Sequence, residues 1–251
     1  TNLNIINIIM KETYTYGNNL AFTYTPSVVT AILERPVALV DRWSPTLESI
    51  LVKQLMLEHA LLQFKPTAEQ ARRSINYIRQ YMPLKVGLLT NKNEEDWYWQ
   101  CSSPCFKINY EDKQEYRKYW NTKDWFPERI TSKITWFVVA HTDGLCDILN
   151  RINYIGKPKT NSYSLIKEWT VKEVEYDWHL WRGVRNSYYL NKPVPIKYFN
   201  RFYLSGSSPS PATIPRLDTQ LIVHWGWKSP VTFEFNQDKC YMPNRNILTP
   251  D

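Results

Sequence analysis

The sequence predicts an α+β fold, because two strand-like runs are each followed by a run with helical spacing of apolar residues. The first pair is a strand at 25–34 and a helix at 45–62, and the second is a strand at 133–140 and a helix at 143–153. A hydrophobic content of 43% supports a core, and 251 residues allow one large domain or two small ones. Two ferredoxin-like halves or one elaborated α+β domain both fit this order.

The first strand is predicted from the β-branched and aromatic run "FTYTPSVVTAIL". Ser44 is the expected N-cap of the helix after it, and Pro45 suits its first turn. Apolar residues then recur at helical spacing as far as Leu62. A shorter helix is predicted over Ala68–Tyr81, ended by Pro83.

The stretch Leu84–Ile130 is predicted to be irregular, apart from a strand that closes in a turn in "DWYWQCSSPCF". The run "KITWFVVA" after it is a clear strand. In "HTDGLCDILNRI" the apolar residues follow helical spacing, with Thr142 or Asp143 as the expected cap. The run "SLIKEWTVKEVEY" alternates as a strand should. Between this helix and this strand lies the basic, small-polar loop 156–163.

Positive charge is concentrated in two stretches of the chain. The formal net charge is +7 and the pI is near 9.1, which favours polyanionic partners without identifying one. Arg151–Lys167 contains no acidic residue, and neither does the stretch from Trp178 to Leu217. The second stretch interleaves aromatic residues with these basic ones: Arg182, Arg185, Lys192, Lys197, Arg201 and Arg216. Cations for phosphates and flat rings for unpaired bases favour nucleic-acid contact, and packing of the aromatics on the body is the alternative.

Known catalytic and cofactor motifs are missing from the sequence. Pro158 stands where a P-loop needs Ser or Thr, and there is no G-x-G-x-x-G. The four histidines lie near no hydrolase or metalloprotease motif, so no catalytic residue, metal or cofactor is expected. The four cysteines are expected to be reduced thiols. No run is long and apolar enough to span a membrane, and a cytoplasmic protein is expected.

The loop is predicted to hold an anionic backbone. Gly156 is the expected left-handed C-cap that ends the helix before it. Lys157 and Lys159 flank Pro158, whose fixed φ keeps the segment extended and brings both ammonium groups within reach of one backbone. A solvated connector between helix and strand is the alternative.

Four motifs in order resemble the RAMP superfamily of CRISPR–Cas proteins, most closely the type IV effector subunit of the fifth Cas family. They are "RPVALVDRWSPTLESIL" (Arg35–Leu51), "PLKVGLLTNKNEEDWYWQCSSPCF" (Pro83–Phe106), "ILNRINYIGKPKTNSYSLIKEWTV" (Ile148–Val171) and "NKPVPIKYF" (Asn191–Phe199). The family's loop is glycine-rich, whereas Asn161 and Ser164 stand near the expected glycines here.

The resemblance implies a ferredoxin-like (RRM-like) core at 21–177 with a thumb-like insertion near 100–132. Residues 1–20 would form an N-terminal extension, and 178–251 a basic, proline- and aromatic-rich extension packed on the core. It also implies a non-catalytic subunit that grips the 5′ handle of the CRISPR RNA. Its expected partners are this RNA, the backbone and large effector subunits, and target DNA near the protospacer-adjacent motif. The expected RNA-binding residues are Arg35, Arg42, Trp43, Arg117, Lys118, Gly156, Lys157, Lys159, Asn161, Tyr163, Arg182, Arg185, Lys192 and Arg201.

Two alternatives belong to other classes of protein. The first is a RAMP endoribonuclease that cuts precursor CRISPR RNA, in which His141 or Tyr163 would be the acid or base. Such nucleases usually carry the glycine-rich loop near the C-terminus, unlike this chain. The second is a binding module whose aromatic surface meets only protein. Cleavage of RNA by the purified protein would distinguish the nuclease from the non-catalytic RNA-binding subunit. Salt-dependent RNA binding would distinguish both of these from a module that binds only protein.

Overall fold

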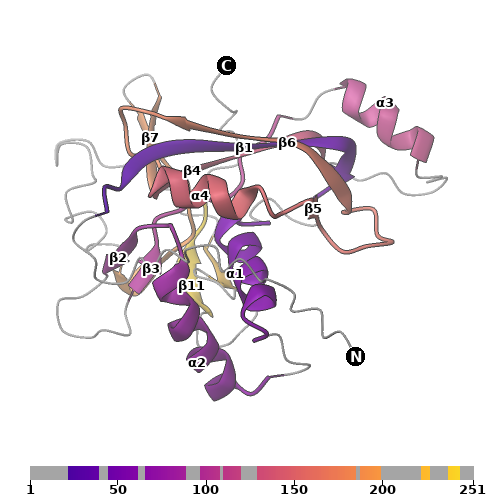
Figure 1. Ribbon diagram of the computed structural model, residues 1–251. Helices are drawn as coiled ribbons and strands as arrows, with labels where there is room; N and C mark the ends of the chain where they lie inside the picture. The colour runs from indigo at the N-terminus through magenta and orange to yellow at the C-terminus, as the bar shows by residue number, and fades with distance from the viewer. Residues whose placement is uncertain are drawn as a thin grey trace, which may run out of the picture.

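The computed structural model describes residues 22–39, 45–61, 66–88, 97–107, 110–119, 129–184, 187–198, 222–226 and 237–243. Within these ranges the chain is a mixed α+β protein, as the sequence predicts (Figure 1). Its largest sheet has four antiparallel strands in the order β4-β1-β6-β5, and three smaller sheets accompany it. The N-terminal extension predicted at 1–20 lies outside the described residues.

The central strand of the large sheet is β1 (Thr25–Ala38), which pairs antiparallel with β4 (Ile130–Ala140) on one side and β6 (Ser164–Glu173) on the other. The two-residue strand β5 (Tyr154–Ile155) lies along the start of β6. The three strands predicted here are therefore present: β1 and β4 are longer than predicted, and β6 ends three residues earlier than the predicted run. Because β4 and β6 are each antiparallel to β1, they run parallel to each other across it.

Helices cover one face of this sheet. They are α1 (Leu47–Glu58), α2 (Ala68–Ile78), which continues as a 3₁₀ turn (Arg79–Tyr81), and α4 (Thr142–Leu149). The expected caps are wrong at two helices. Thr46 caps α1 by accepting the Ser49 N–H at 3.3 Å, and His141 Nδ1 caps α4 by accepting the Gly144 N–H at 3.2 Å. Ser44 lies outside the described residues.

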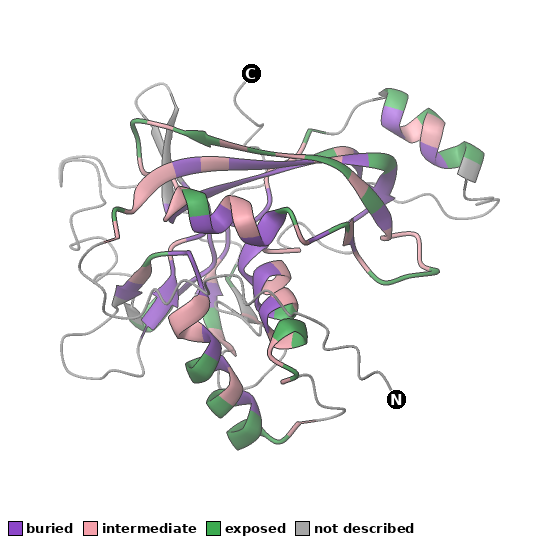
Figure 2. Ribbon diagram, viewed as in Figure 1, coloured by how far each residue is buried: buried purple, intermediate pink, exposed green. Residues whose placement is uncertain are grey.

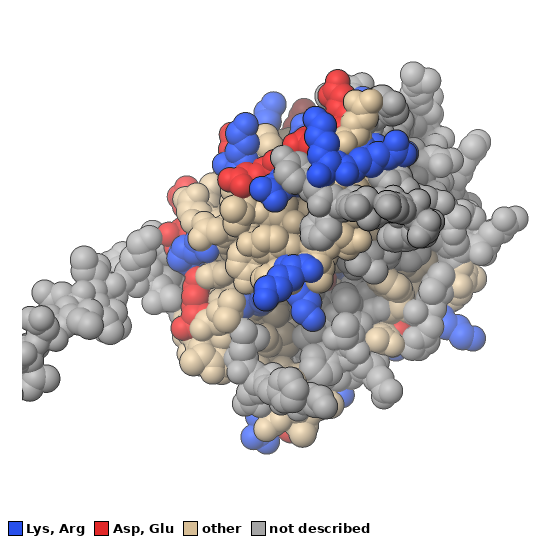
Figure 3. Space-filling model, turned by 90° about the vertical axis from the view of Figure 1, so that its right-hand side faces the viewer, with Lys and Arg blue, Asp and Glu red and all other residues tan. Residues whose placement is uncertain are grey.

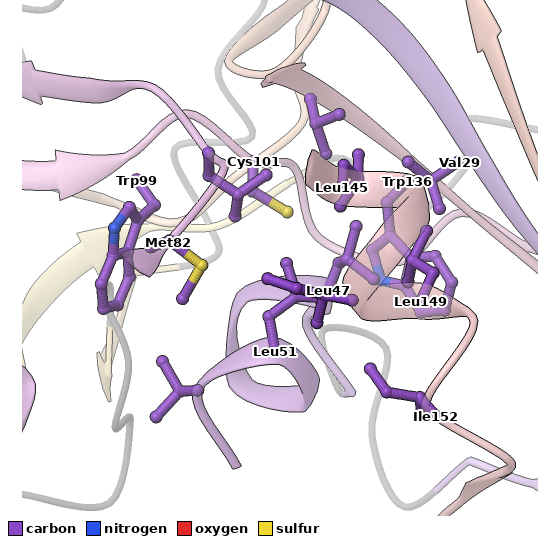
Figure 4. Packing of buried hydrophobic residues seen from close by; sticks show 14 of the residues in the cluster. Val29, Leu47, Leu51, Met82, Trp99, Cys101, Trp136, Leu145, Leu149 and Ile152 are labelled. Atoms are coloured by element: carbon purple, nitrogen blue, oxygen red, sulfur yellow. The ribbon is translucent and has the colours of Figure 1, made fainter. Parts of the chain in front are cut away.

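The core lies between these helices and the sheet. Side chains from α1, α4, β1 and β4 meet there, including the fully buried Leu47, Leu51, Trp136 and Leu145 (Figure 4). The Trp136 indole N–H donates to the carbonyl of Pro45 at 2.9 Å, which fixes the start of α1 over the sheet. Figure 2 shows the same layer as the most buried part of the fold.

A connecting segment covers the outer edge of β4. It includes the short hairpin of β2 (Val86–Leu88) and β3 (Trp97–Trp99). Residues 101–105 then run antiparallel beside β4, where the Ser102 N–H donates to Phe137 at 2.8 Å and Cys105 exchanges two bonds with Thr135. This edge is consequently paired, and the strand predicted within "DWYWQCSSPCF" is present as β3.

A further helix, α3 (Tyr110–Tyr119), also lies in the stretch predicted to be irregular. Its first turn carries Glu111 and Asp112 and its last turn Arg117 and Lys118, a charge order that suits the helix dipole. The fully buried Tyr116 packs it against Ala38 of β1 and Ile130 of β4. The Asp112 carboxylate accepts the Ser132 N–H at 2.9 Å.

The C-terminal third contains strands rather than only coil. Its elements are β7 (Trp181–Val184), β8 (Ser187–Leu190), β9 (Val194–Pro195), a 3₁₀ turn (Ile196–Tyr198), β10 (Ile222–Gly226) and β11 (Gln237–Tyr241). Trp178 packs edge-on against Phe137, with ring centroids 5.3 Å apart, on the sheet face opposite the helices. None of the helices in the described ranges has the length and apolarity to span a membrane.

Candidate nucleic-acid interface

The basic loop 156–163 is the tip of a β5–β6 hairpin, not the predicted helix–strand connector. Gly156 does adopt a left-handed conformation, with φ of +85°. A Cβ at this position would lie 1.9 Å from the Ser162 carbonyl oxygen, so only glycine fits there. The helix-capping role predicted for Gly156 is wrong, because α4 ends at Leu149 and Asn150 is its C-cap.

Both lysines of the loop are exposed, and one of them has an unusual backbone. Lys159 has a φ of +65°, a region that residues with a Cβ rarely adopt. The Thr160 N–H and hydroxyl both donate to the Lys157 carbonyl, at 3.2 and 2.7 Å, and close a turn around Pro158. The turn directs Lys157, Pro158 and Lys159 outward, where all three are exposed to solvent.

Asn161 and Ser164, which stand near the glycines of the resembling family, tie the loop to β1. The Ala38 N–H donates to the Asn161 carbonyl at 3.0 Å, and the Arg35 N–H donates to the Ser164 hydroxyl oxygen at 3.1 Å. The Ser164 hydroxyl in turn donates to the Leu165 carbonyl. Hydrogen bonds to β1 therefore hold the base of the loop in place.

Two tyrosines and a lysine lie at the base of the loop. The rings of Tyr154 and Tyr163 are 5.6 Å apart between centroids, and both are half-buried. The ammonium of Lys53, from α1, lies 4.9 Å from the Tyr154 ring centroid, a cation–π distance. Sequence analysis did not single out Lys53, because only the fold brings α1 to this hairpin.

Helix α3 lies against the same loop. Burial raises the pKa of Tyr116, and the neighbouring Asn161 side chain counteracts part of the rise. Tyr116 holds α3 next to Asn161 of the loop. The next two residues, Arg117 and Lys118, have exposed side chains on the same side of the molecule as the loop. Figure 3 views this side: basic residues stand among uncharged ones near its centre, and mixed charges lie at the height of α3.

The structure thus brings together expected RNA-binding residues from three separate segments. We call this set the basic face, and its members are Arg35, Arg117, Lys118, Lys157, Lys159, Asn161 and Tyr163. The segments are the end of β1, the end of α3 and the β5–β6 loop. A cluster of exposed cations with half-buried aromatic rings can neutralise phosphates and stack on unpaired bases.

One expected RNA-binding residue is contradicted by the structure. Lys192 is only 3% exposed, and its ammonium bonds the buried Glu48 carboxylate at 2.8 Å. A buried, paired lysine cannot neutralise the phosphates of an external RNA, so Lys192 is a structural residue. Arg42, Trp43, Arg185 and Arg201 lie outside the described residues, and of Arg182 only the backbone in β7 is described.

Basic residues of the two acid-free stretches form ion pairs with acidic residues from other parts of the chain. Lys197 pairs with Asp238 at 2.6 Å, and Arg151 pairs with Glu58 at 2.7 Å and with Asp147. These acids come from elements distant in the chain or from the preceding helical turn. The concentration of charge along the sequence therefore overstates the positive charge available to a ligand.

The residues considered for catalysis or metal binding have other surroundings. His141 caps α4 and packs edge-on against Phe22, with centroids 4.9 Å apart. All four cysteines are free, and burial raises the pKa of Cys101 to about 12, which keeps its thiol protonated. Across the described parts of the chain, no cluster of His, Cys, Asp and Glu could hold a metal ion.

No protein-family model matches the chain, and no curated protein matches it.

Proposed function

We propose that this chain is a non-catalytic RNA-binding subunit of a CRISPR–Cas effector complex in the cytoplasm. It grips the 5′ handle of the CRISPR RNA through the basic face and docks onto neighbouring effector subunits. The observation that carries RNA binding is the loop 156–163, which holds two exposed lysines on a turn fixed to β1. The assignment to CRISPR rests on the four motifs that resemble the RAMP superfamily.

The backbone of Lys159 favours a functional loop over a plain connector. A left-handed residue in an exposed turn is normally glycine or asparagine, and another residue costs about 1 kcal/mol or more. The chain nevertheless places a long cationic side chain there. The turn around Pro158 requires this backbone conformation, so the observation that favours a role for the charge is the lysine in place of the usual glycine or asparagine.

The strand order is compatible with the ferredoxin-like core that the resemblance implies. Along the chain, β1, α1, the strand-like segment 101–105, β4, α4 and β6 give the order βαββαβ. In space β1 lies between β4 and β6, with 101–105 beyond β4. In this arrangement the loop lies between the second core helix and the last core strand, where the family's glycine-rich loop is expected.

The endoribonuclease alternative would need an acid and a base close together. Thr142, next to His141, hydrogen-bonds Glu173 at the end of β6, whereas Tyr163 precedes its first residue. The ten-residue strand separates the two by about 30 Å. His141 and Tyr163 therefore cannot act as one catalytic pair, and a nuclease that uses either of them would need a different second residue.

The test replaces both lysines of the loop with alanine. Lys157→Ala with Lys159→Ala should weaken binding of labelled single-stranded RNA by ~1–3 kcal/mol. Because two phosphate contacts are lost, the slope of log K against log salt should fall by about 1.4. Folding should be retained, since both side chains are exposed.

The matched control is Lys133→Ala with Lys239→Ala, which removes two exposed lysines from β4 and β11. This control should bind RNA as the parent does. A folded loop variant with the parent's affinity and salt slope would contradict the proposal. The CRISPR assignment is tested by sequencing the RNA that co-purifies with the chain, which should have one defined 5′ end. Cleavage of a precursor RNA by the purified chain would instead favour the nuclease.

A further inference from the structure

The large sheet has an open edge along β6. β5 pairs only with Ser164 and Leu165, and the next contact is the Ile166 N–H, which donates to the Asn153 carbonyl. From Lys167 to Glu173, none of the strands in the described ranges pairs with this side of β6. Most side chains of this window are exposed, as Figure 2 shows.

The free main-chain groups at this edge can be identified from the register. The Val174 N–H donates to the Pro26 carbonyl at 2.9 Å, so the even-numbered residues from Glu168 to Lys172 direct their main-chain groups toward β1. A register shift at Lys167 reverses this alternation, which is why the Ile166 N–H points away from β1. Trp169, Val171 and Glu173 therefore direct theirs outward. An edge of this kind is a template for another strand.

The sequence of the open window is complementary to itself. It reads Lys-Glu-Trp-Thr-Val-Lys-Glu from Lys167 to Glu173, and Thr170 is its midpoint. Placed antiparallel to a second copy about Thr170, Glu168 of each copy faces Lys172 of the other, whereas Lys167 lies at the register shift where the regular part of the strand ends. In this register Trp169 of one copy lies opposite Val171 of the other, on the side of the helices. The outward main-chain groups of these residues therefore also face each other.

Other registers lose this match. A shift that places Thr170 opposite Trp169 of the second copy sets Lys167 against Lys172, and the opposite shift sets Glu168 against Glu173. Like charges directly opposite each other destabilise a strand pair. Shifts by a further residue leave no lysine–glutamate pair within the window. Charges on an edge strand commonly prevent pairing, but here one register sets Glu168 against Lys172 twice per dimer.

We propose that the β6 edge is a homodimer interface, in which two copies pair antiparallel about a twofold axis at Thr170. The axis makes the contact isologous, as in most homodimers. Pairing joins the two four-stranded sheets into one continuous sheet. The window ends where β5 begins to cover β6, so the position of β5 itself limits the partner strand to this length.

The test reverses one charge and then restores complementarity. Lys172→Glu sets glutamate against Glu168 of the second copy twice per dimer. It should raise the dimer dissociation constant about tenfold or more in sedimentation experiments on the full chain without RNA. Glu168→Lys added to Lys172→Glu recreates both attractions in reverse and should restore the parent's dimerisation.

Within the described residues neither side chain faces an opposite charge across the β1–β6 pair, where Lys172 lies opposite Val28 and Glu168 opposite Ile32. The control Lys239→Glu makes the same charge change on β11 and should leave dimerisation unchanged. A parent chain that stays monomeric at the highest attainable concentration overturns the proposal. A double variant that dimerises no better than Lys172→Glu also overturns it.

Discussion

Left-handed backbone conformations mark three positions among the residues that the structure describes. Gly156 needs both the conformation and the missing Cβ, because the Ser162 carbonyl occupies that space. Ala60, with φ of +53°, follows the end of α1, where the Leu61 N–H returns to the Met56 carbonyl at 2.8 Å. This is the usual place for a glycine cap. Lys159 follows Pro158 in the turn that the Thr160 N–H closes on the Lys157 carbonyl, a position where type II turns require a positive φ and usually have glycine or asparagine. The choice of lysine at this position is why its side chain is assigned to the ligand.

Replacing Lys159 or Ala60 with glycine distinguishes the effect of the backbone conformation on stability from the effect of the side chain on RNA binding. Each substitution relieves a left-handed backbone at an exposed site and should raise the free energy of unfolding by about 1 kcal/mol. Ala60→Gly should leave RNA binding unchanged. Lys159→Gly should weaken RNA binding although the protein becomes more stable. Thermal unfolding and RNA titration of both variants provide the measurement, and Lys159→Gly with full RNA affinity would show that its charge is not used.

Local chemistry explains which residues of the site could be predicted. Gly156, Lys157 and Lys159 lie in one loop, so the sequence alone groups them. The hydrogen bond from the Arg35 N–H to Ser164 joins residues far apart in the chain, and no local pattern reports it. The same holds for Lys192, whose partner Glu48 lies in α1 and whose burial reverses its expected role.

At the scale of elements, strands and helices with strong apolar periodicity were predictable, and those fixed by tertiary contacts were not. β1, β4 and α4 carry their own pattern of buried residues. α3 is a polar helix whose main buried aromatic is Tyr116, so its sequence shows charge order but almost no apolar stripe. The short strands of the C-terminal third owe their form to pairing between distant segments, as in β9 with β11.

The seating of α3 yields a prediction about the basic face. Tyr116→Ala removes the ring that packs against Ala38 and Ile130 and should cost about 3 kcal/mol of stability. With α3 displaced, Arg117 and Lys118 no longer lie beside the loop. Arg117→Ala with Lys118→Ala should therefore reduce RNA affinity in the parent but have little further effect in the Tyr116→Ala background.

Tyr116→Phe is the matched control, because it keeps the ring and should keep the effect of the double change. Binding energies from RNA titrations of all four combinations give the coupling. Fully additive losses would mean that α3 contributes to RNA binding without being held by Tyr116.

At the scale of the whole molecule, buried polar contacts attach the C-terminal third to the core. His179 Nδ1 lies 2.5 Å from the Asp177 carboxylate, and its Nε2 lies 3.3 Å from the Tyr98 hydroxyl on β3. Burial alone would raise the pKa of Asp177, but the hydrogen bond and charge of His179, with the charge of Lys85, lower it below its usual value. Asp177 thus stabilises the fold at neutral pH, and this contribution is lost as the pH falls through its lowered pKa.

The pair of Glu48 and Lys192 is the second attachment, and it joins the first turn of α1 to the segment before β9. Lys192→Met leaves the Glu48 carboxylate buried without its partner and should cost about 3–5 kcal/mol in urea unfolding. Glu48 Oε1 makes no hydrogen bond within the described residues, so the pair is incompletely satisfied. Glu48→Leu added to Lys192→Met should therefore recover most of the loss. The double variant should also bind RNA with the parent's salt slope, because Lys192 does not reach the surface. If the double variant were as unstable as Lys192→Met, the loss of stability would come from losing the ion pair itself. It would then not come from leaving the Glu48 carboxylate buried without a partner.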